Sequence, residues 1–366
     1  MKVFVCTCCS NLVYFENTTC EKCSSRLGFS PALKKILALE SDGKFWRLAN
    51  DPQAEFRFCM NEQYNACNWI IPSGDAEAFC ATCRHNRAIP DLAIEENLYR
   101  WQKLELAKHY LFYGLLKLQL PLETRQQNPE FGLAFEVLTD TPEAPVVTGH
   151  QNGVITINLA EADDAIREQR RTELGEPYRT LTGHFRHEIG HYYWDRLVRD
   201  ADRLDGFRDC FGDERLDYSD ALAKYYADGP PANWRDDFVS AYASAHPWED
   251  FAETWAHFLH IVDTLEMAGS LGLRVKPLVV DDAVYRAEVK FDPYGAINID
   301  QLVGAWLPIA GAVNSINRCM GQRDLYPFVL TPGVIRKLGF VQGLLRRRRS
   351  RTGKKWPGGT AIDALR

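Results

Sequence analysis

The sequence lacks any hydrophobic run of membrane-spanning length, because nowhere do roughly 18 apolar residues follow one another. The segment MKVFVCTCCS holds too short an apolar run for a secretory signal peptide. These two absences argue against a helical membrane protein and against secretion. We therefore expect a cytoplasmic protein that has no membrane partner.

Positive charge is also scarce outside the last segment of the chain. The net charge is −6, and residues 340–366 alone carry +7, so the remainder carries −13. An acidic body repels the phosphate backbone, so nucleic-acid binding is not expected. Segment 346–366 is rich in Arg and Lys and poor in apolar residues, which predicts a basic disordered tail.

Cysteine, by contrast, is abundant, with eleven residues. Without a signal peptide, reduced thiols and metal binding are favoured over disulfides. A first set has the spacing C-x2-C-x10-C-x2-C, in which two tight turns can supply four thiolates to one zinc ion. Its members are Cys6, Cys9, Cys20 and Cys23. Cys8 lies inside the first pair, and we interpret it as a bystander.

A second set predicts another zinc ion, although only its last pair has C-x2-C spacing. The alternative is one pair of ligands accompanied by two core cysteines. Four thiolates leave no open coordination position, so both sites are expected to be structural. Zinc binding would also supply folding free energy to this region. The four residues are Cys59, Cys67, Cys80 and Cys83.

The rest of the chain alternates between strand and helix patterns. Apolar residues at three- and four-residue steps predict a long helix over 91–119. Three strand-like runs follow, and then a helix over about 177–198. From Gly206 onward the pattern is mainly helical. The predicted class is α+β, with a small mixed sheet, and the predicted strands cover 131–138, 144–150 and 153–160.

The segment LTGHFRHEIGHYYWDRLV holds the first sign of catalytic chemistry. His187 and His191 are four residues apart, so both imidazoles project from one face of the helix. H-E-x-x-H is the zinc-peptidase pattern, in which the histidines bind zinc and the glutamate acts on the metal-bound water. Ile189 and Gly190 keep the packed side of the helix apolar and slim. Glu188 is therefore the candidate general base.

A third ligand is expected from the helix that begins at Pro247. Glu249 and Glu253 lie four residues apart in SAYASAHPWEDFAETWAHFLH. One carboxylate could bind the metal while the other holds the free N–H of a ligand histidine. The alternative is a helix with two solvated glutamates, which the aromatic and apolar surroundings disfavour.

The motifs HEIGH and YASAHPWEDFAE resemble those of the gluzincin class of zinc metallopeptidases, in particular the lethal-factor type. This resemblance implies that Glu249 binds zinc, that Glu253 supports a ligand histidine, and that Tyr242 assists at the transition state. The chain up to about residue 345 also resembles a family of zinc-binding metallopeptidases with an N-terminal zinc ribbon. The motifs that carry this second resemblance are LGFSP, CNW, AIPDL, HEIGHYYW, HPWEDFAETWAHFLH and NRCMGQRDLYPFVL.

Other histidines near these motifs are weighed against the ligand set. His184 is interpreted as a surface residue in preference to a supporting group. His246 could compete for the metal, but Glu249 already completes a ligand set. His257 and His260 are expected to pack or to form hydrogen bonds. The acidic segment 211–222 is interpreted as a solvated loop in preference to a lip of the cleft.

The expected function is zinc-dependent hydrolysis of a peptide or protein substrate. Glu188 takes a proton from the attacking water, and zinc with Tyr242 stabilises the oxyanion. In the class that the chain resembles, an edge strand before the active helix pairs with the substrate, and strand 153–160 is assigned this role. One alternative is a non-catalytic adaptor built on a zincin scaffold. Another is a nucleic-acid-binding protein, which the acidic body disfavours.

Three regions are predicted from these patterns. Residues 1–90 form a zinc-ribbon region with two four-cysteine zinc sites, which would recognise an unknown partner. Residues 91–345 form a mainly helical, zincin-like metallopeptidase domain. Residues 346–366 form the basic tail. The expected cofactor content is one catalytic and two structural zinc ions.

Overall fold

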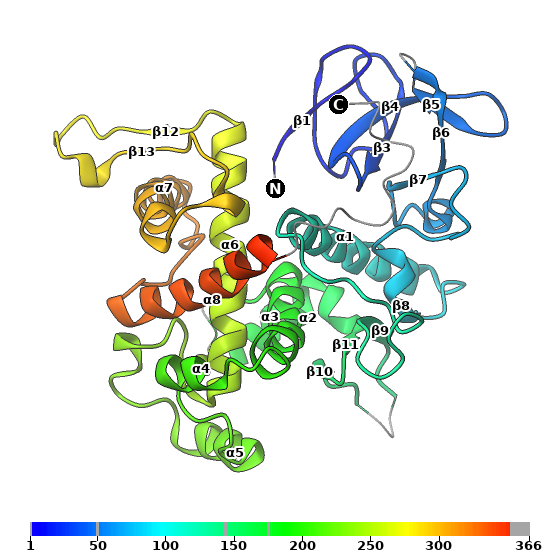
Figure 1. Cartoon of the computed structure of the whole chain (residues 1–366). Coiled ribbons are helices and arrows are strands. Elements are labelled where there is room, and N and C mark those ends of the chain that lie inside the picture. Colours follow the sequence, from blue (N-terminus) through cyan, green and yellow to red (C-terminus); the bar gives the residue numbers. More distant parts are fainter. Residues whose placement is uncertain (1, 49–50, 142–144, 174–175, 177, 352–366) are drawn as a thin grey trace.

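The computed structural model describes residues 2–48, 51–141, 145–173, 176 and 178–351 (Figure 1). Strands dominate the N-terminal region and helices dominate the remainder, which confirms the predicted α+β class. The N-terminal hairpin pairs β1 (Phe4–Val5) with β2 (Leu12–Val13). A five-stranded antiparallel sheet follows in sequence order, with strands β3 (Arg26–Ser30), β4 (Lys35–Ser41), β5 (Trp46–Leu48), β6 (Asp51–Phe58) and β7 (Ile70–Pro72).

The cysteine-rich region and the helical region share one hydrophobic core. Their contact is made by α1 (Glu95–Lys117), which confirms the predicted long helix with slightly shorter ends. The rings of Phe15 and Phe29 lie 5.6 and 6.0 Å from the ring of Tyr113 on α1. The regions on the two sides of residue 90, the predicted boundary, therefore share a continuous core.

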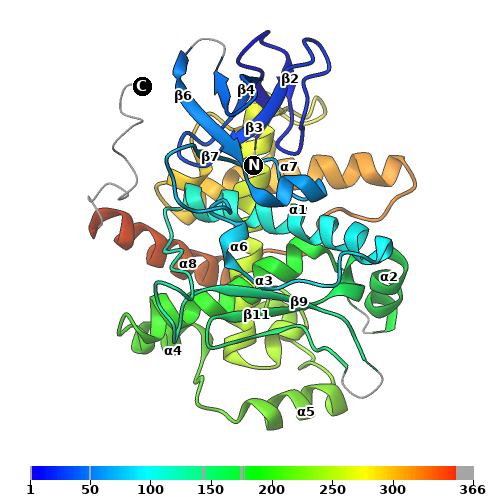
Figure 2. The ribbon, with the colours of Figure 1, turned by 90° about the vertical axis from the view of Figure 1, so that its right-hand side faces the viewer.

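A four-stranded mixed sheet lies under α1 (Figure 2). Its spatial order is β10-β11-β9-β8, so β8, which precedes residue 90, joins the sheet of the following region. β8 and β11 are parallel to β9, and β10 is antiparallel to β11. The strands are β8 (Asn86–Ala88), β9 (Ala134–Leu138), β10 (Gly149–Gln151) and β11 (Val154–Asn158).

The assignment of strand 153–160 to the sheet edge is wrong. β11 lies inside the sheet, and the three-residue strand β10 forms the edge. Asn152 and Gly153 have φ of +47° and +83°, and they form the tight turn between β10 and β11. This turn places β10 on the outer side of β11. Asn-Gly is the dipeptide favoured in such tight hairpins. Residue 144 of the predicted preceding strand lies outside the described residues.

The helical region is built around two long helices, α3 and α6. In Figure 1, α6 runs vertically through the molecule, with α3 on one side of it and α7 on the other. Within the described residues, no helix combines the length and the apolar character that crossing a membrane requires. The α-helices and β-strands of this region are α2 (Asp164–Glu173), α3 (Leu181–Trp194), α4 (Leu204–Phe211), α5 (Tyr218–Asp228), α6 (Pro247–Ser270), β12 (Arg274–Val275), β13 (Ala287–Glu288), α7 (Ile299–Cys319) and α8 (Pro332–Arg351).

The ends of α3 and α6 are set by capping groups. The Thr180 side chain accepts a hydrogen bond from the backbone N–H of Gly183, and the His246 side chain accepts one from that of Trp248. Both caps satisfy backbone donors that a helix N-terminus otherwise leaves unpaired. Pro247 at the first helical position suits the start of α6. These caps fix where the metal-binding motifs lie along each helix.

Gly190 allows α3 and α6 to approach closely. A Cβ atom at this position would lie 3.0 Å from Ala252 Cα and 3.2 Å from Trp255 Cβ, both on α6. Real Cβ atoms rarely come so near backbone, so a larger residue would push the helices apart. The predicted slim side of the α3 helix is therefore the side that contacts α6.

We expect Gly190→Ala to destabilise the fold, although Ala is normally the better helix former. Overpacking of a tight contact typically costs about 1–3 kcal/mol. Gly304→Ala on α7 is the matched control, because a Cβ atom there would meet nothing within 4 Å. Thermal unfolding of the two variants is the measurement. Equal melting temperatures would show that α3 and α6 can separate without cost.

α8 is tied to α6 by a buried ion pair. Lys337 Nζ lies 2.6 Å from Asp250 Oδ2, and both side chains are almost fully buried. α8 continues past the predicted domain end at residue 345 and stops at Arg351. The first part of the predicted disordered tail is therefore helical. Residues 352–366 of that tail lie outside the described residues.

Candidate metal centres and active site

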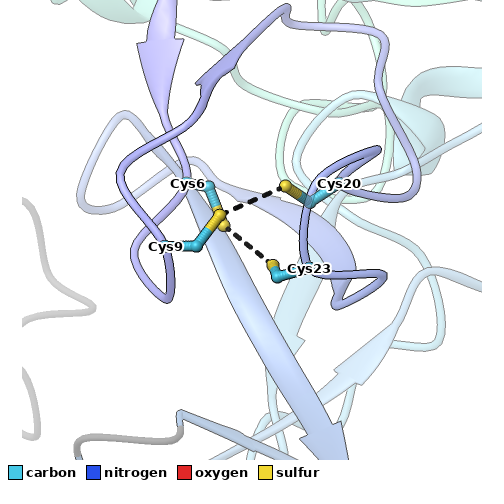
Figure 3. A group of neighbouring side chains, drawn as sticks. All are labelled: Cys6, Cys9, Cys20 and Cys23. Atoms are coloured by element: carbon cyan, nitrogen blue, oxygen red, sulfur yellow. Dashed lines mark hydrogen bonds between the residues drawn. The ribbon is translucent and has the colours of Figure 1, made fainter.

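The first cysteine set converges on one point (Figure 3). Cys6 and Cys23 have Sγ atoms 3.7 Å apart, and those of Cys9 and Cys20 are 3.6 Å apart. A tetrahedral zinc with Zn–S bonds of about 2.3 Å requires sulfur separations of roughly 3.8 Å. The four thiols therefore fit a zinc ion. Cys8 is exposed and lies outside the group, as predicted.

Two similar turns build this first set. Ser10 and Ser24 each follow the second cysteine of a pair, with φ of +59° and +58°. Each Ser N–H donates to the carbonyl of the first cysteine of its pair, at 3.0 and 2.8 Å. Hydrogen bonding to Ser25 lowers the pKa of the Cys23 thiol to about 6. The thiolate form is the one that binds metal.

The second cysteine set also comes together, and all four of its members are buried. The Sγ atoms of Cys67 and Cys80 are 3.7 Å apart. The backbone N–H of Trp69 donates to Cys67 Sγ, and that of Cys80 donates to Cys59 Sγ, both at 3.3 Å. The four cysteines thus form one group, as the predicted second site requires, and the alternative of one ligand pair with two unrelated core cysteines does not hold.

Helix α1 adds two groups beside this second set that the spacing did not indicate. His109 Nδ1–H donates to the Glu105 carbonyl at 2.6 Å. The other ring nitrogen then faces Cys67 Sγ at 3.2 Å and Cys83 Sγ at 3.7 Å. The Glu105 carboxylate lies 3.7 Å from Cys83 Sγ and pairs with the buried Lys108. A single histidine on a helix gives no local sign of this placement.

A third group unites α3 and α6. His187 and His191 have Nε2 atoms 3.1 Å apart. Glu249 Oε2 lies 3.0 Å from the first of these nitrogens and 3.6 Å from the second. Zinc bonds to imidazole and carboxylate of about 2.0–2.2 Å imply ligand separations of roughly 3.4 Å. The three atoms therefore fit one face of a zinc coordination tetrahedron and leave its fourth position open.

Two further features of Glu249 suit a cation. Its Oε2 atom is buried, and no group in the described residues gives it a well-formed hydrogen bond. Burial alone raises the pKa of Glu249, but His191 and His187 outweigh it and hold the pKa well below the usual range. The carboxylate is thus charged, with lone pairs directed at the two imidazoles.

Glu253 contacts His187, and the resemblance implies that this carboxylate supports a ligand histidine. Its Oε1 accepts a hydrogen bond from His187 Nδ1–H at 2.7 Å. Its Oε2 accepts another from the Ser240 hydroxyl at 2.6 Å. This chain of contacts fixes the tautomer that presents the His187 Nε2 lone pair to the site. Ser240 was not singled out by the sequence patterns.

Glu188, the candidate general base, is a buried neighbour of the two histidines. It lies on α3 between the two histidines, and 8% of its surface is exposed. Burial raises the pKa of Glu188, and the neighbouring His187 and His191 offset only part of this effect. A carboxylate with a raised pKa accepts a proton more readily near neutral pH.

Tyr242 lies beside the same group. The centroid of its ring is 6.0 Å from that of His187. Burial, and then the charge of Glu249, raise the pKa of Tyr242 above its usual range. The side chain is therefore a neutral phenol that can donate a hydrogen bond.

A second tyrosine reaches the site from the segment predicted to be a solvated loop. Tyr218 begins α5, and its hydroxyl donates to Glu249 Oε1 at 2.8 Å. The solvated-loop assignment of 211–222 is therefore wrong at this residue. The placement of Tyr218 could not be predicted from the sequence, because a lone tyrosine among charged residues forms no recognisable motif.

Trp248 and His150 stand beside His191, and neither was predicted. The rings of Trp248 and His191 have centroids 3.9 Å apart. His150, on the edge strand β10, stacks parallel to His191 at 6.5 Å. The edge of the sheet that β10 forms therefore approaches the candidate metal site.

The remaining histidines take other roles. His246 Nε2–H donates to the Leu216 carbonyl at 3.1 Å, so this residue is not a ligand. His257 Nδ1 and the Tyr326 hydroxyl are hydrogen-bonded at 2.7 Å, and His260 contacts Arg186. Both agree with the prediction of packing and hydrogen bonding. His184 was interpreted as a surface residue, but it is largely buried, and its Nδ1 lies 3.4 Å from Glu161 Oε2.

Among the described residues, the two four-cysteine groups and the group of His187, His191 and Glu249 lead us to expect three zinc ions per chain in protein purified with zinc. Elemental analysis of the full chain is the measurement. The His191→Ala variant should retain two zinc ions, since it leaves both cysteine groups intact. One zinc ion in the unaltered chain would contradict the second cysteine site.

Comparison with known proteins gives two family matches. Residues 97–344 match the model of a family described as "Putative zinc-binding metallo-peptidase". Residues 3–94 match a zinc-ribbon domain model. Uncharacterised proteins of Mycobacterium bovis and of Mycobacterium tuberculosis are each 42% identical over 342 residues, which is 93% of this chain and 94% of theirs. No solved structure matches the chain significantly.

Proposed function

The chain belongs to this zinc-binding metallopeptidase family, and we propose that it hydrolyses peptide bonds at a gluzincin-type site. The ligands would be His187, His191 and Glu249. The observation that carries the proposal is their convergence within 3.0–3.6 Å beside the buried Glu188. A structural zinc site would be closed by a fourth protein ligand, whereas this group offers three.

Zinc, when bound, supplies Lewis acidity that makes a water molecule acidic near neutral pH and polarises the substrate carbonyl. Glu188 takes the proton of the attacking water and then gives it to the leaving amine. The Tyr242 hydroxyl donates a hydrogen bond to the oxygen on which negative charge develops. Glu253 and Ser240 keep His187 oriented throughout.

The edge strand β10 supports an extended peptide as substrate. Its outer side is not paired with another strand of the described sheet, and its His150 lies beside His191. An extended chain can add to such an edge through backbone hydrogen bonds, which are independent of side-chain sequence. Substrate choice would then depend on the side chains around the site, including Trp248.

The zinc ribbons are proposed to recognise a partner, and this role stays a prediction. The shared core gives the ribbons a second, structural role. Phe15 and Phe29 pack on α1, and His109 of α1 faces the second cysteine set. The cysteine-rich region thereby holds one side of the helix that also packs against α3.

Hydrolysis can be tested without knowing the natural substrate. The zinc-loaded chain is incubated with a mixture of unfolded proteins, and new N-termini are identified by mass spectrometry. We expect cleavage that stops when zinc is chelated and resumes when zinc is restored. The His191→Ala variant is the control that lacks the site. New termini that persist in this variant would reveal a contaminating protease, and none in the unaltered chain would contradict the proposal.

A further inference from the structure

The segment between Gly212 and Gly229 contacts the residues of the candidate site at a small number of points. It contains α5, none of whose eleven residues is buried. Figures 1 and 2 both show α5 at the margin of the molecule, away from the core helices. The two flanking glycines have φ of +98° and +76°, a conformation that glycine adopts without strain. The contacts of this segment with the rest of the molecule come from its first residues and from one face of α5.

The anchor is the start of α6. Tyr218 donates to Glu249 Oε1, and the Leu216 carbonyl accepts from His246. The Tyr218 ring also meets Trp248 edge-on, with centroids 5.8 Å apart. Further along α5, the ring of Tyr225 meets that of Tyr242 at 5.9 Å. An ion pair between Glu214 of the segment and Arg208 of α4 adds a contact near the first residues of the segment. The other residues that hold the segment are a candidate metal ligand and its close neighbours.

The two oxygens of Glu249 have separate partners. Oε2 faces His187 and His191, while Oε1 accepts from Tyr218. The hydrogen bond from Tyr218 to Oε1 thus holds the carboxylate in the orientation that presents Oε2 to the two imidazoles. A hydrogen bond to a ligating carboxylate usually strengthens metal binding, and its loss commonly weakens binding about 10–100-fold.

We propose that Tyr218 is a positioning residue for Glu249 and that its hydrogen bond couples zinc binding to the docking of the Gly212–Gly229 segment. The coupling is reciprocal by thermodynamic necessity. If the docked segment strengthens zinc binding, bound zinc must stabilise the docked segment by the same factor. The segment then behaves as a lid that closes most firmly over the zinc-loaded site. The proposal rests on the metal site proposed above, but it does not require that peptide cleavage be detected.

The first test measures zinc affinity of the full chain by competition with a chelator, using elemental analysis as readout. We expect Tyr218→Phe to lose the zinc of the histidine site at about 10–100-fold lower chelator concentration. Phenylalanine keeps the ring contacts and removes only the hydroxyl. Tyr226→Phe on the same helix is the matched control and should behave like the unaltered chain, because Tyr226 is 63% exposed. Equal affinity for all three proteins would overturn the proposal.

The second test measures hydrogen exchange of the backbone amides of 216–228 with and without zinc in the histidine site. The His191→Ala variant serves as the metal-free reference. In the unaltered chain, zinc should slow exchange in this segment. In Tyr218→Phe, exchange should be fast whether or not zinc is bound. Exchange that does not respond to zinc in the unaltered chain would overturn the coupling. If the unaltered chain binds no third zinc ion, the result contradicts the proposed metal site itself and not only the coupling.

Discussion

The Glu188→Gln variant is expected to lose hydrolysis by a factor of about 10²–10⁴ and to retain all its zinc. Glutamine has nearly the same shape as glutamate, so packing against α6 should be preserved. Its amide, however, cannot take a proton from water. Since the metal group consists of His187, His191 and Glu249, no ligand is removed. Initial cleavage rates on a peptide identified in the unfolded-protein mixture, with elemental analysis, measure both effects.

Glu168→Gln on α2 is the matched control for this variant. Its carboxylate is 62% exposed and pairs with Arg171, so it contributes to surface charge without touching the site. The control should cleave at the rate of the unaltered chain. Loss of zinc together with activity in Glu188→Gln would mean that the Glu188 charge holds the metal. Retained activity would remove Glu188 from the base role.

Local geometry explains why part of the candidate site could be predicted from the sequence. Four residues make about one helical turn, so His187 with His191, and Glu249 with Glu253, had to share a helix face. The C-x2-C pairs are equally local, because one tight turn brings both sulfurs together. For the first cysteine set and for the histidine site, the fold had only to bring two preformed pairs into contact.

The residues that sequence reasoning missed reach the site through long-range packing. His109 faces the second cysteine set only because α1 lies beside it, and Tyr218 reaches Glu249 only because the first residue of α5 lies beside the start of α6. The edge strand was misassigned for a related reason. Alternation in 153–160 predicts a strand, but it does not reveal which neighbours that strand has in the sheet. The Asn152-Gly153 turn was the signal that β10 pairs with the outer side of β11.

Tyr242→Phe is expected to lower kcat by about 10²–10³ with little change in KM. The hydroxyl should act only when negative charge develops on the substrate oxygen, so it stabilises the transition state more than the bound substrate. Zinc occupancy should be unchanged, because the metal group does not include Tyr242. Steady-state kinetics with a cleavable peptide and elemental analysis are the measurements.

The competing interpretation is that only the ring of Tyr242 matters, since it packs near His187 and Tyr225. Phenylalanine keeps that ring, so packing alone predicts near-normal turnover and identical thermal stability. A fall in kcat with unchanged stability would therefore assign the effect to the hydroxyl. Tyr326 cannot replace it in the native arrangement, because its hydroxyl is engaged with His257.

Comparison with Tyr218→Phe separates the roles of the two phenols near Glu249. Tyr218 donates directly to that carboxylate, so its loss should appear first in zinc affinity. Tyr242 lies beside the ligand group without belonging to it, so removal of its hydroxyl should appear in kcat while chelator sensitivity stays the same. If instead Tyr242→Phe released zinc and Tyr218→Phe slowed turnover at full zinc occupancy, the two assignments would be exchanged. Tyr218 would then be the donor to the developing oxyanion, and α5 would carry part of the catalytic machinery.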